Sequence, residues 1–526
     1  MNGWRIIKME SSDNKRLAIN IIANIIAFAV NFVISFFLTP YIVETVGKEA
    51  YGFVSLGNNF VNYASLITVA LNSMASRFIT IEIQKKDYDS ASKYFSSILI
   101  ANILICLVVA IPLALIVIFL QNIVNVPQDS LIDIKILWTL LFTNFAIDLI
   151  SNVFAISTFA RNRIDLYAKK SIVAYLIKAI ILLVCYKFFN PYVFFIGLAT
   201  VIYSVLMLIA NIRLYRKLTP EIKIDKKLFD KKCIKELTFS GIWNTISRVG
   251  SIALTELDLL LSNLLIDASA MGTLSLVKMV PNYVVNLTST ITNAFMPNLT
   301  IAYANASENK EFMLKQIRKS IKILLLFHSF IYGILIAYSD IFYGLWLHME
   351  SAEEIKYMYL LGIISIGGCF ISAVSYIMTN IYTVFNKLKI SSMTVIFTGL
   401  ISSILTFIVV KNTSLGLIAI AGVSVVLVII RNIAILMPYA AKCVGIPWYS
   451  FYKDLALNVF VIAYSVAISF ILKCIIPVNG WFGLVGICVI DTIIIFCVNL
   501  LVLLKKEDRS ILLDKIKAKV RKVKQS

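Results

Sequence analysis

The sequence predicts an all-α polytopic membrane protein with fourteen transmembrane helices, arranged as two parallel six-helix lobes followed by two extra C-terminal helices. The 526-residue chain is 60% hydrophobic and has a mean hydropathy of +0.87, whereas soluble domains are about 45–50% apolar. Uncharged runs at 17–38 and 95–127 are long enough for a bilayer crossing of roughly 20 residues. In addition, the stretch 52–80 is echoed at 272–300.

Hydropathy places the spans in order along the chain. The first, at 17–38, has too long an apolar core for a signal peptide, lacks a small-residue cleavage site and is followed by further spans, so we interpret it as a retained helix. Only Asn190–Pro191 separates the fifth span from the sixth. The predicted spans are 17–38, 51–81, 95–120, 134–159, 171–189, 192–212, 239–265, 272–303, 323–346, 357–384, 390–410, 415–440, 454–475 and 481–504.

The positions of Lys and Arg predict the orientation, because these residues are enriched in cytoplasmic loops. With the N-terminus inside, 38 of the 49 Lys and Arg fall in cytoplasmic segments, six in outer loops or at the outer ends of spans, and five deeper within spans. Both termini are therefore expected in the cytoplasm. The net charge of +20 is spread over many short loops, so it indicates topology, and we expect no nucleic-acid partner.

The repeat assigns the spans to lobes. At a constant offset of 220 residues, seven of 29 positions are identical, including Gly52 with Gly272 and Tyr63 with Tyr283. Six spans per half is an even number, so the halves are parallel and related by a pseudo-twofold axis along the membrane normal. The predicted parts are a cytoplasmic N-terminus (1–16), an N-lobe (17–212), a basic cytoplasmic loop (213–238), a C-lobe (239–440), two further helices (441–504) and a basic cytoplasmic tail (505–526).

Ionisable residues within the spans are the first candidates for function, since each costs roughly 2.5–3.5 kcal/mol at bilayer depth and is normally turned toward protein or a wet cavity. Three of the five cations lie on the repeated spans 2, 7 and 8, which predicts a cationic cleft between the lobes. The candidates are Arg77, Asp148, Lys178, Arg248, Glu256, Asp258, Lys278, Arg431 and Asp491.

Several of these residues have more than one interpretation. Arg77 is close enough to the cytoplasmic end of its span to reach the interface, or it lines the cleft. Arg248 lies too deep in its span for its side chain to reach the membrane–water interface. It either lines a cavity or forms a charge pair with Glu256, two turns along the same helix. Asp148 and Lys178 sit at mid-depth on successive helices, where we expect a structural ion pair.

Uncharged polar residues also line the repeated spans. Asn62 and Asn282 occupy equivalent repeat positions, and their amides can bind sugar hydroxyls or join helices by hydrogen bonds. His328 is expected to be a packing residue. The other polar residues on these spans are Asn58, Asn59, Asn72, Ser73, Asn286 and Asn293.

No pattern in the chain predicts catalysis or a bound cofactor. We find no nucleophile elbow, zinc-protease motif or phosphate-binding glycine-rich loop. The eight cysteines form no CxxC pair and only two histidines are present, so no metal site or disulfide framework is expected. The outer loops are too short for a soluble domain, which places the activity within the membrane.

A family resemblance rests on short motifs at the ends of the spans. They are Thr39–Pro40, Val46–Gly47, Tyr51–Gly52, Arg77, Asp258, Met271–Gly272, Pro297–Asn298–Leu299 and Phe342–Trp346. With these motifs and the 12 + 2 plan, the chain resembles the Wzx-type polysaccharide flippases of the multidrug/oligosaccharidyl-lipid/polysaccharide exporter superfamily. One departure is Gly272–Thr273–Leu274, where a Gly-x-Tyr pattern is usual.

The resemblance implies a flippase for polyprenyl-diphosphate-linked oligosaccharides in the bacterial cytoplasmic membrane, serving O-antigen, capsule or exopolysaccharide synthesis. Arg77, Arg248 and Lys278 would hold the diphosphate, and Asn62 and Asn282 would contact the sugar. Glu256 and Asp258 would couple transport to protons or sodium. A polysaccharide polymerase and a chain-length regulator would be partners. The alternatives are an ion-coupled multidrug exporter of the same superfamily and a membrane polysaccharide polymerase or ligase.

Overall fold

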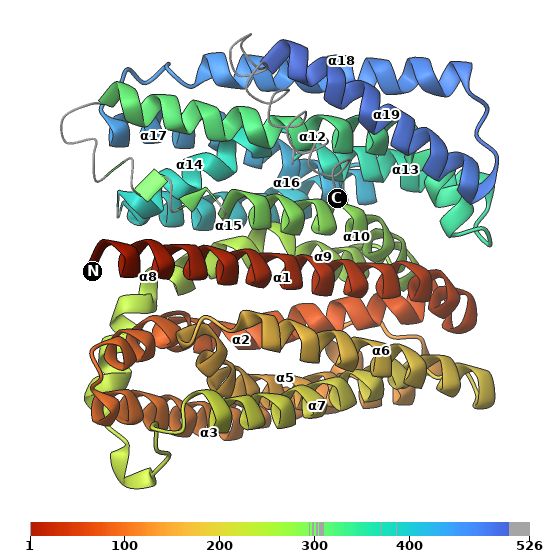
Figure 1. Ribbon diagram of the computed structural model, residues 1–526. Helices are drawn as coiled ribbons and strands as arrows, with labels where there is room; N and C mark the ends of the chain where they lie inside the picture. Colours follow the sequence, from red (N-terminus) through yellow and green to blue (C-terminus); the bar gives the residue numbers. More distant parts are fainter. Residues whose placement is uncertain are drawn as a thin grey trace, which may run out of the picture. The chain divides into compact units, whose positions relative to one another are not determined.

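The fold is known from a computed structural model, which describes residues 2–293, 295–296, 299–300, 303, 310–368, 370–385 and 387–503. Every regular element in these ranges is helical (Figure 1), which confirms the predicted fold class. The chain divides into two compact units, Met1–Leu276 with Val395–Asn412, and Val277–Thr394 with Thr413–Ser526. The predicted lobe boundaries remain a prediction, and the basic tail lies outside the described residues.

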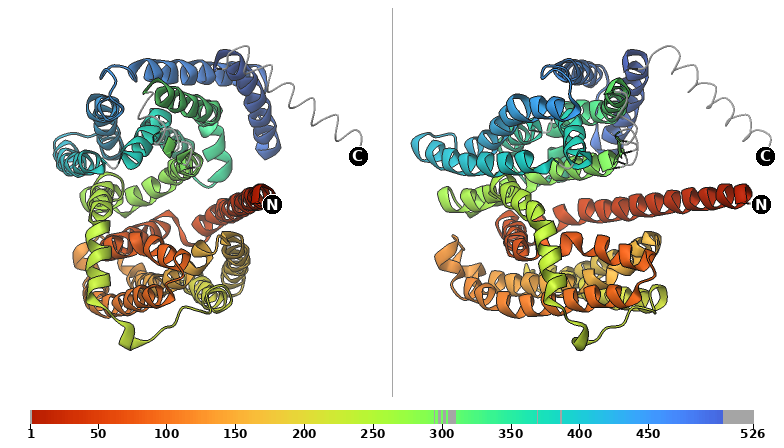
Figure 2. Two further views of the ribbon diagram at one scale, coloured as in Figure 1. Left: turned by 60° about the vertical axis from the view of Figure 1, so that its left-hand side comes forward. Right: turned by 90° about the vertical axis from the view of Figure 1, so that its left-hand side faces the viewer.

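The first unit contains the six N-terminal spans, the seventh, and parts of two others. Its helix α5 packs against both α3 and α7, which are among the orange to yellow-green helices in Figure 2. The elements are α1 (Asn2–Val46), α2 (Lys48–Gln84), α3 (Tyr88–Ile118), α4 (Leu120–Ile123), η1 (Gln128–Ser130), α5 (Leu131–Ala160), α6 (Ile164–Phe188), α7 (Phe194–Leu218), η2 (Lys226–Leu228), α8 (Lys231–Thr255), α9 (Leu257–Leu265), the start of α10 (Ala268–Asn293) and most of α15 (Leu388–Asn412).

The second unit takes the remainder of α10 and α15 and is centred on the long helix α12. Helices α18 and α19 both pack against α12. The elements are α12 (Lys310–Trp346), α13 (Ala352–Gly367), α14 (Ser372–Val384), α16 (Leu417–Arg431), the π-helix η3 (Asn432–Leu436), α17 (Met437–Val444), α18 (Tyr452–Ile475) and α19 (Gly480–Leu503).

Local chemistry sets several helix boundaries. Gly47 takes a φ of 87° between α1 and α2, a left-handed value that favours glycine. Asn190–Pro191 separates α6 from α7 as predicted, and the Asp133 carboxylate accepts hydrogen bonds from the Val193 and Phe194 main-chain N–H groups at 2.7 and 2.8 Å. These two bonds satisfy amides at the start of α7 that have no partner within the helix.

Eleven helical segments in the described ranges are long and apolar enough to cross a membrane. They correspond to eleven of the fourteen predicted spans. The other three predicted spans, 239–265, 272–303 and 357–384, are not among these eleven, and the second of them lies partly outside the described residues. The first is broken between α8 and α9 and the third between α13 and α14. Broken or polar helices are tolerated at membrane depth where protein or a water-filled cavity covers them.

The interior of the first unit is held by aromatic and apolar contacts across α2, α3, α5 and α7. Phe95 stacks on Tyr215 with ring centroids 4.9 Å apart, and the Trp138 indole N–H donates to the Phe53 carbonyl at 3.1 Å. Both Phe95 and Trp138 are almost fully buried. This packing fixes α2, which carries the site residues described next.

Candidate functional site

The candidate site is centred on a break in the seventh predicted span. Helix α8 ends at Thr255 and α9 begins at Leu257, so Glu256 stands between them with φ −109° and ψ −22°. A break within a helix frees main-chain carbonyls from their usual partners, and each unsatisfied group is costly at membrane depth. The interruption therefore needs partners from a neighbouring element.

Helix α2 supplies those partners. The Asn59 side-chain amide donates to the Glu256 carbonyl oxygen at 2.7 Å, and the Tyr63 hydroxyl donates to the same oxygen at 2.9 Å. Two donors on one carbonyl stabilise the break and tie α2 to the end of α8. The sequence indicated Asn59 only as a polar residue, and its one signal for Tyr63 was the identity with Tyr283 in the repeat.

The Glu256 side chain neutralises Arg248, the arginine of this span. Its Oε1 lies 2.9 Å from Arg248 Nη2, and the side chains are 14% and 34% exposed respectively. The structure thus contains the charge pair that was one of the two interpretations of Arg248. Because the guanidinium is still partly exposed, a second anion can reach it without a rearrangement of the surrounding side chains.

Arg77 lies on the same pair of helices at another level. Asn244 on α8 donates to the Ser73 hydroxyl on α2 at 3.0 Å, and the two helices are antiparallel. Arg77 is one turn beyond Ser73, and Arg248 is one turn beyond Asn244 in the opposite direction. Their levels differ by about 12 Å at 1.5 Å per residue. Arg77 is exposed and makes no hydrogen bond or ion pair with the described part of the chain.

The other predicted residues of the first unit have different environments. Asp258 is 4% exposed in the first turn of α9, where a helix N-terminus favours a negative charge. Asn62 is half-buried, and its amide makes no hydrogen bond with a described residue. The first unit therefore brings together Arg248, Glu256 and Asp258 around the break, with Asn62 on the adjoining helix.

Two predicted site residues belong to the second unit. Lys278 and Asn282 are four residues apart on α10, so they share one face of that helix with Asn286. Lys278 is half-buried, while Asn282 and Asn286 are exposed. These three form a polar stripe on a helix that the sequence places in the membrane, and their part in a common cleft stays a prediction.

Other polar residues of the spans serve helix packing. Asn72 exchanges hydrogen bonds with Asn102 on α3, and His328 is buried and hydrogen-bonded to Thr288 at 2.8 Å. Asp148 and Lys178 attract each other electrostatically, as predicted, but no direct ion-pair contact joins them in the described structure. Asp148 instead accepts a hydrogen bond from Asn144 on its own helix at 3.2 Å.

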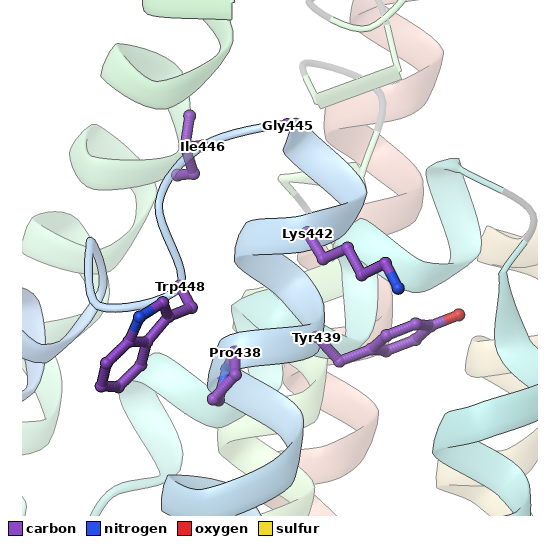
Figure 3. Close-up of a pocket in the computed structure, with 6 residues that line it drawn as sticks. All are labelled: Pro438, Tyr439, Lys442, Gly445, Ile446 and Trp448. Atoms are coloured by element: carbon purple, nitrogen blue, oxygen red, sulfur yellow. The ribbon is translucent and has the colours of Figure 1, made fainter.

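A pocket in the second unit lies away from these residues, at the end of α17. It has a volume of about 500 Å³, and Figure 3 shows Lys442 and Tyr439 extending in the same direction. Aromatic and basic residues at the end of a span are typical of the membrane–water interface, so we assign this pocket to the interface. Its lining residues are Pro438, Tyr439, Lys442, Gly445, Ile446 and Trp448.

Comparison with solved structures defines the class of fold. The chain is similar to the lipid II flippase MurJ in an inward closed conformation, with a TM-score of 0.63 and 13% identity over 91% of this chain and 97% of that one. It is also similar to an inward-facing multidrug resistance MATE family transporter of the MOP superfamily, with a TM-score of 0.62 and 13% identity over 82% and 97%. The chain therefore shares the fold of these transporters.

Comparison of sequences gives the family. The polysaccharide biosynthesis protein family matches residues 17–302, more than half of the chain, and the chain belongs to that family. It is also 26% identical, over 95% of its length and 98% of the relative's, to the uncharacterized membrane protein EpsK of Bacillus subtilis strain 168. The protein is thus a multi-pass membrane member of the polysaccharide biosynthesis family.

Proposed function

We propose that this protein is a flippase that moves polyprenyl-diphosphate-linked oligosaccharide repeat units across the bacterial cytoplasmic membrane by alternating access. The observation that carries the proposal is the partly exposed Arg248, held by Glu256 at a helix break within a span. A guanidinium binds the oxygens of a diphosphate in a bidentate manner. A family that serves polysaccharide synthesis supports a sugar-bearing passenger.

The ion pair suggests how passenger and coupling ion exchange. In the unloaded protein, Glu256 is the counterion of Arg248. When a diphosphate binds Arg248, it replaces the Glu256 carboxylate, which is then left without a cation at membrane depth. An uncompensated carboxylate there is unfavourable, so Glu256 takes up a proton or sodium ion. Passenger and ion thus bind together, and the buried Asp258 is the second acid available for coupling.

The position of Arg77 suggests an order of events. In the predicted orientation Arg77 lies nearer the cytoplasmic end of α2, and it is exposed. It is the first cation that a headgroup entering from the cytoplasm would meet, with Arg248 about 12 Å deeper along the same two helices. Asn62 and Asn282 then offer amide groups to the sugar, and Lys278 offers a further positive charge.

Replacement of Arg248 tests the proposal in cells. Arg248→Ala should abolish surface polysaccharide and cause lipid-linked repeat units to accumulate, at unchanged protein level in the membrane. Arg216→Ala is the matched control, because Arg216 is an exposed arginine at the end of α7. Normal polymer output from the Arg248 variant at normal expression would refute the proposed role.

The fold similarity to a MATE transporter keeps a drug exporter as the second candidate. The exposed Arg77 argues against it, because its positive charge would repel a cationic drug. Overexpression should therefore leave the sensitivity of a drug-sensitive host to cationic compounds unchanged. A gain in resistance that is lost in Arg248→Ala would favour the exporter instead.

A further inference from the structure

One carboxyl group of the second unit lies where the described residues do not stabilise a negative charge. Asp491, on α19, is fully buried, and neither of its oxygens has a hydrogen-bond partner among the described residues. A buried ionised carboxylate without donors or a counterion is strongly unfavourable, the more so in a membrane span. Whether Asp491 binds a proton, a metal ion or a basic side chain therefore depends on the groups around it.

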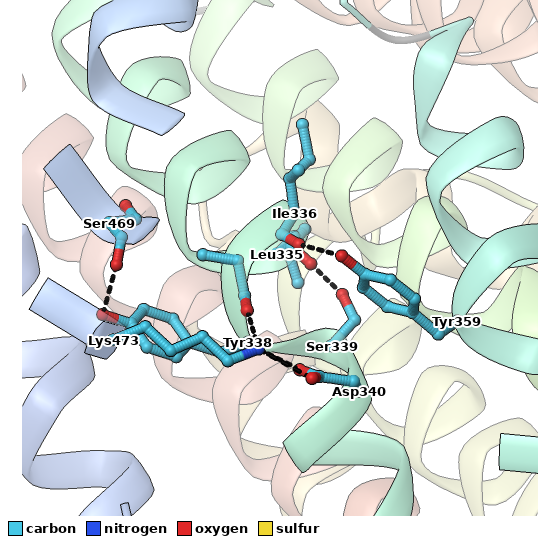
Figure 4. A network of polar contacts seen from close by, with 9 residues as sticks. Leu335, Ile336, Tyr338, Ser339, Asp340, Tyr359, Ser469 and Lys473 are labelled. Carbon is cyan, nitrogen blue, oxygen red and sulfur yellow. Dashed lines mark hydrogen bonds and ion pairs between the residues drawn. The ribbon is translucent and has the colours of Figure 1, made fainter. Parts of the chain in front are cut away.

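The hydroxyl groups near Asp491 already donate hydrogen bonds to main-chain carbonyl groups. The Tyr338 hydroxyl on α12 donates to the Ser469 carbonyl at 3.0 Å (Figure 4). On α18, the Ser469 hydroxyl donates to the Ser465 carbonyl at 3.0 Å, and the Ser465 hydroxyl donates to the Val461 carbonyl at 2.7 Å. Ser469, the polar side chain beside Asp491, can thus accept a hydrogen bond but has no proton to give.

The packing also leaves no room for a hydrated ion. At Gly333 on α12, an added Cβ would lie 2.7 Å from Ser469 Oγ, 3.1 Å from Ile495 Cδ1 and 3.1 Å from the Ser465 carbonyl oxygen. The three helices therefore approach closely beside Asp491. A sodium ion needs several oxygen ligands, whereas this layer offers apolar atoms and carbonyls that already accept hydrogen bonds.

Among the described residues, the charged and titratable groups near Asp491 do not supply a counterion. Tyr338 faces Asp491 from α12, and Cys488 lies one turn earlier on α19. On α18 the closest cation is Lys473, one turn beyond Ser469, and its amino group contacts both oxygens of Asp340 at 2.7 Å (Figure 4). That lysine is neutralised by another acid.

Two other acids on the same helices are paired with cations. Asp454 at the start of α18 is held by Arg318 at 3.3 Å, and Asp340 is held by Lys473. Asp491 belongs to the same assembly of α12, α18 and α19, but no cation of the described chain pairs with it. Its environment fits a neutral acid, which carries a proton that it can donate.

We propose that Asp491 is a proton-binding site on the two extra C-terminal helices. In this conformation the carboxyl is protonated and its O–H is available to the Ser469 oxygen. Release of the proton requires α19 to separate from α12 so that water reaches the carboxylate. Protonation of Asp491 therefore stabilises the packing of α19 against α12. This role does not depend on what the protein transports.

Infrared spectroscopy of the full-length protein in lipid nanodiscs tests this site. Aspartate labelled with ¹³C at the side-chain carboxyl shifts the bands of the aspartate carboxyls away from those of glutamate. At neutral pH the wild type should show a protonated-carboxyl band that falls by one group per molecule in Asp491→Asn. The matched controls Asp340→Asn and Asp454→Asn should retain that intensity, because those two acids are paired with cations.

Asp491→Glu gives a second, independent comparison if the amide variant fails to fold. It keeps an acid in place but removes the label, so the same band should fall by one group. A spectrum in which either variant loses a carboxylate band instead would overturn the proposal. A wild-type carboxylate band that shifts when sodium replaces choline would also overturn it, in favour of a sodium site.

Discussion

Gly52 and Gly272, which occupy equivalent positions of the internal repeat, contact each other within the first unit. A Cβ added to Gly52 would lie 2.9 Å from the Gly272 Cα, and one added to Gly272 would lie 2.5 Å from the Lys48 carbonyl oxygen. Equivalent positions that meet are expected at a twofold axis. The contact therefore supports the pseudo-twofold relation that the repeat predicts, and it explains why both positions are glycine.

Substitution of these glycines should destabilise the protein. Gly272→Ala forces apart backbones that cannot yield as a flexible side chain would, and we expect a loss of about 1–3 kcal/mol of stability. Gly486→Ala on α19 is the control, because no atom lies within 4 Å of its added Cβ. Thermal unfolding of the purified variants measures the difference. Equal melting temperatures would show that the contact is loose.

Removal of the Glu256 charge should strengthen anion binding. Glu256→Gln leaves Arg248 without its counterion, so inorganic diphosphate should bind to the purified protein about tenfold more tightly, equivalent to about 1.4 kcal/mol. Calorimetric titration gives the affinities. The gain should disappear in the Arg248→Ala/Glu256→Gln double variant. Unchanged or weaker binding by Glu256→Gln would contradict the exchange of carboxylate for diphosphate.

The helix break should depend on the two donors of α2. Tyr63→Phe leaves Asn59 on the Glu256 carbonyl, so we expect a cost of about 1 kcal/mol, within the range for polar contacts in membranes. Tyr63→Phe combined with Asn59→Leu leaves the carbonyl without either donor and should cost more than the two single changes together. Unfolding of all three variants tests this. Strict additivity would mean that water replaces the lost donors.

The start of α3 should respond to pH through Asp87. The Ser90 main-chain N–H donates to Asp87 Oδ1 at 3.0 Å, and this bond lowers the pKa of the carboxyl below its usual value. Because the folded pKa is lowered, the cap stabilises the helix above the unfolded pKa of about 3.9 and is lost as pH falls through the folded value.

Hydrogen exchange of the Ser90 amide measures this cap. Protection in the wild type should exceed that in Asp87→Ala several-fold at about pH 7, and the ratio should approach one as the pH falls through the lowered pKa of the folded state. Asp87→Asn should protect at neutral and at acid pH, since asparagine also caps helices. A ratio that does not change with pH would exclude the ionised carboxylate as the cap.

Much of the fold follows from the sequence because the bilayer imposes a length and a polarity on each span. The separation at Asn190–Pro191 was readable because proline disfavours helix in the preceding residue. The break at Glu256 was not readable, since neither glycine nor proline marks it. It is stabilised because Asn59 and Tyr63, almost 200 residues earlier, donate hydrogen bonds to the freed carbonyl of Glu256.

The sequence predicted which residues belong to the candidate site better than it predicted the contacts between them. Charge within a span indicated Arg248 and Glu256, and helical spacing allowed them to pair. Depth and helix order also indicated the attraction between Asp148 and Lys178, but they do not reveal that Asn144 donates a hydrogen bond to the acid locally. Spacing reports which side chains share a face, whereas hydrogen bonds depend on neighbours that only the folded chain supplies.

Direct measurement of flipping tests the central claim. The purified protein is placed in vesicles that contain a fluorescent polyprenyl-diphosphate oligosaccharide, and a membrane-impermeant quencher reports which leaflet holds the sugar. We predict that the wild type exchanges the lipid between leaflets much faster than protein-free vesicles do, and that Arg248→Ala removes the acceleration. Exchange no faster than in protein-free vesicles, with folded wild-type protein and an imposed proton or sodium gradient, would contradict the account.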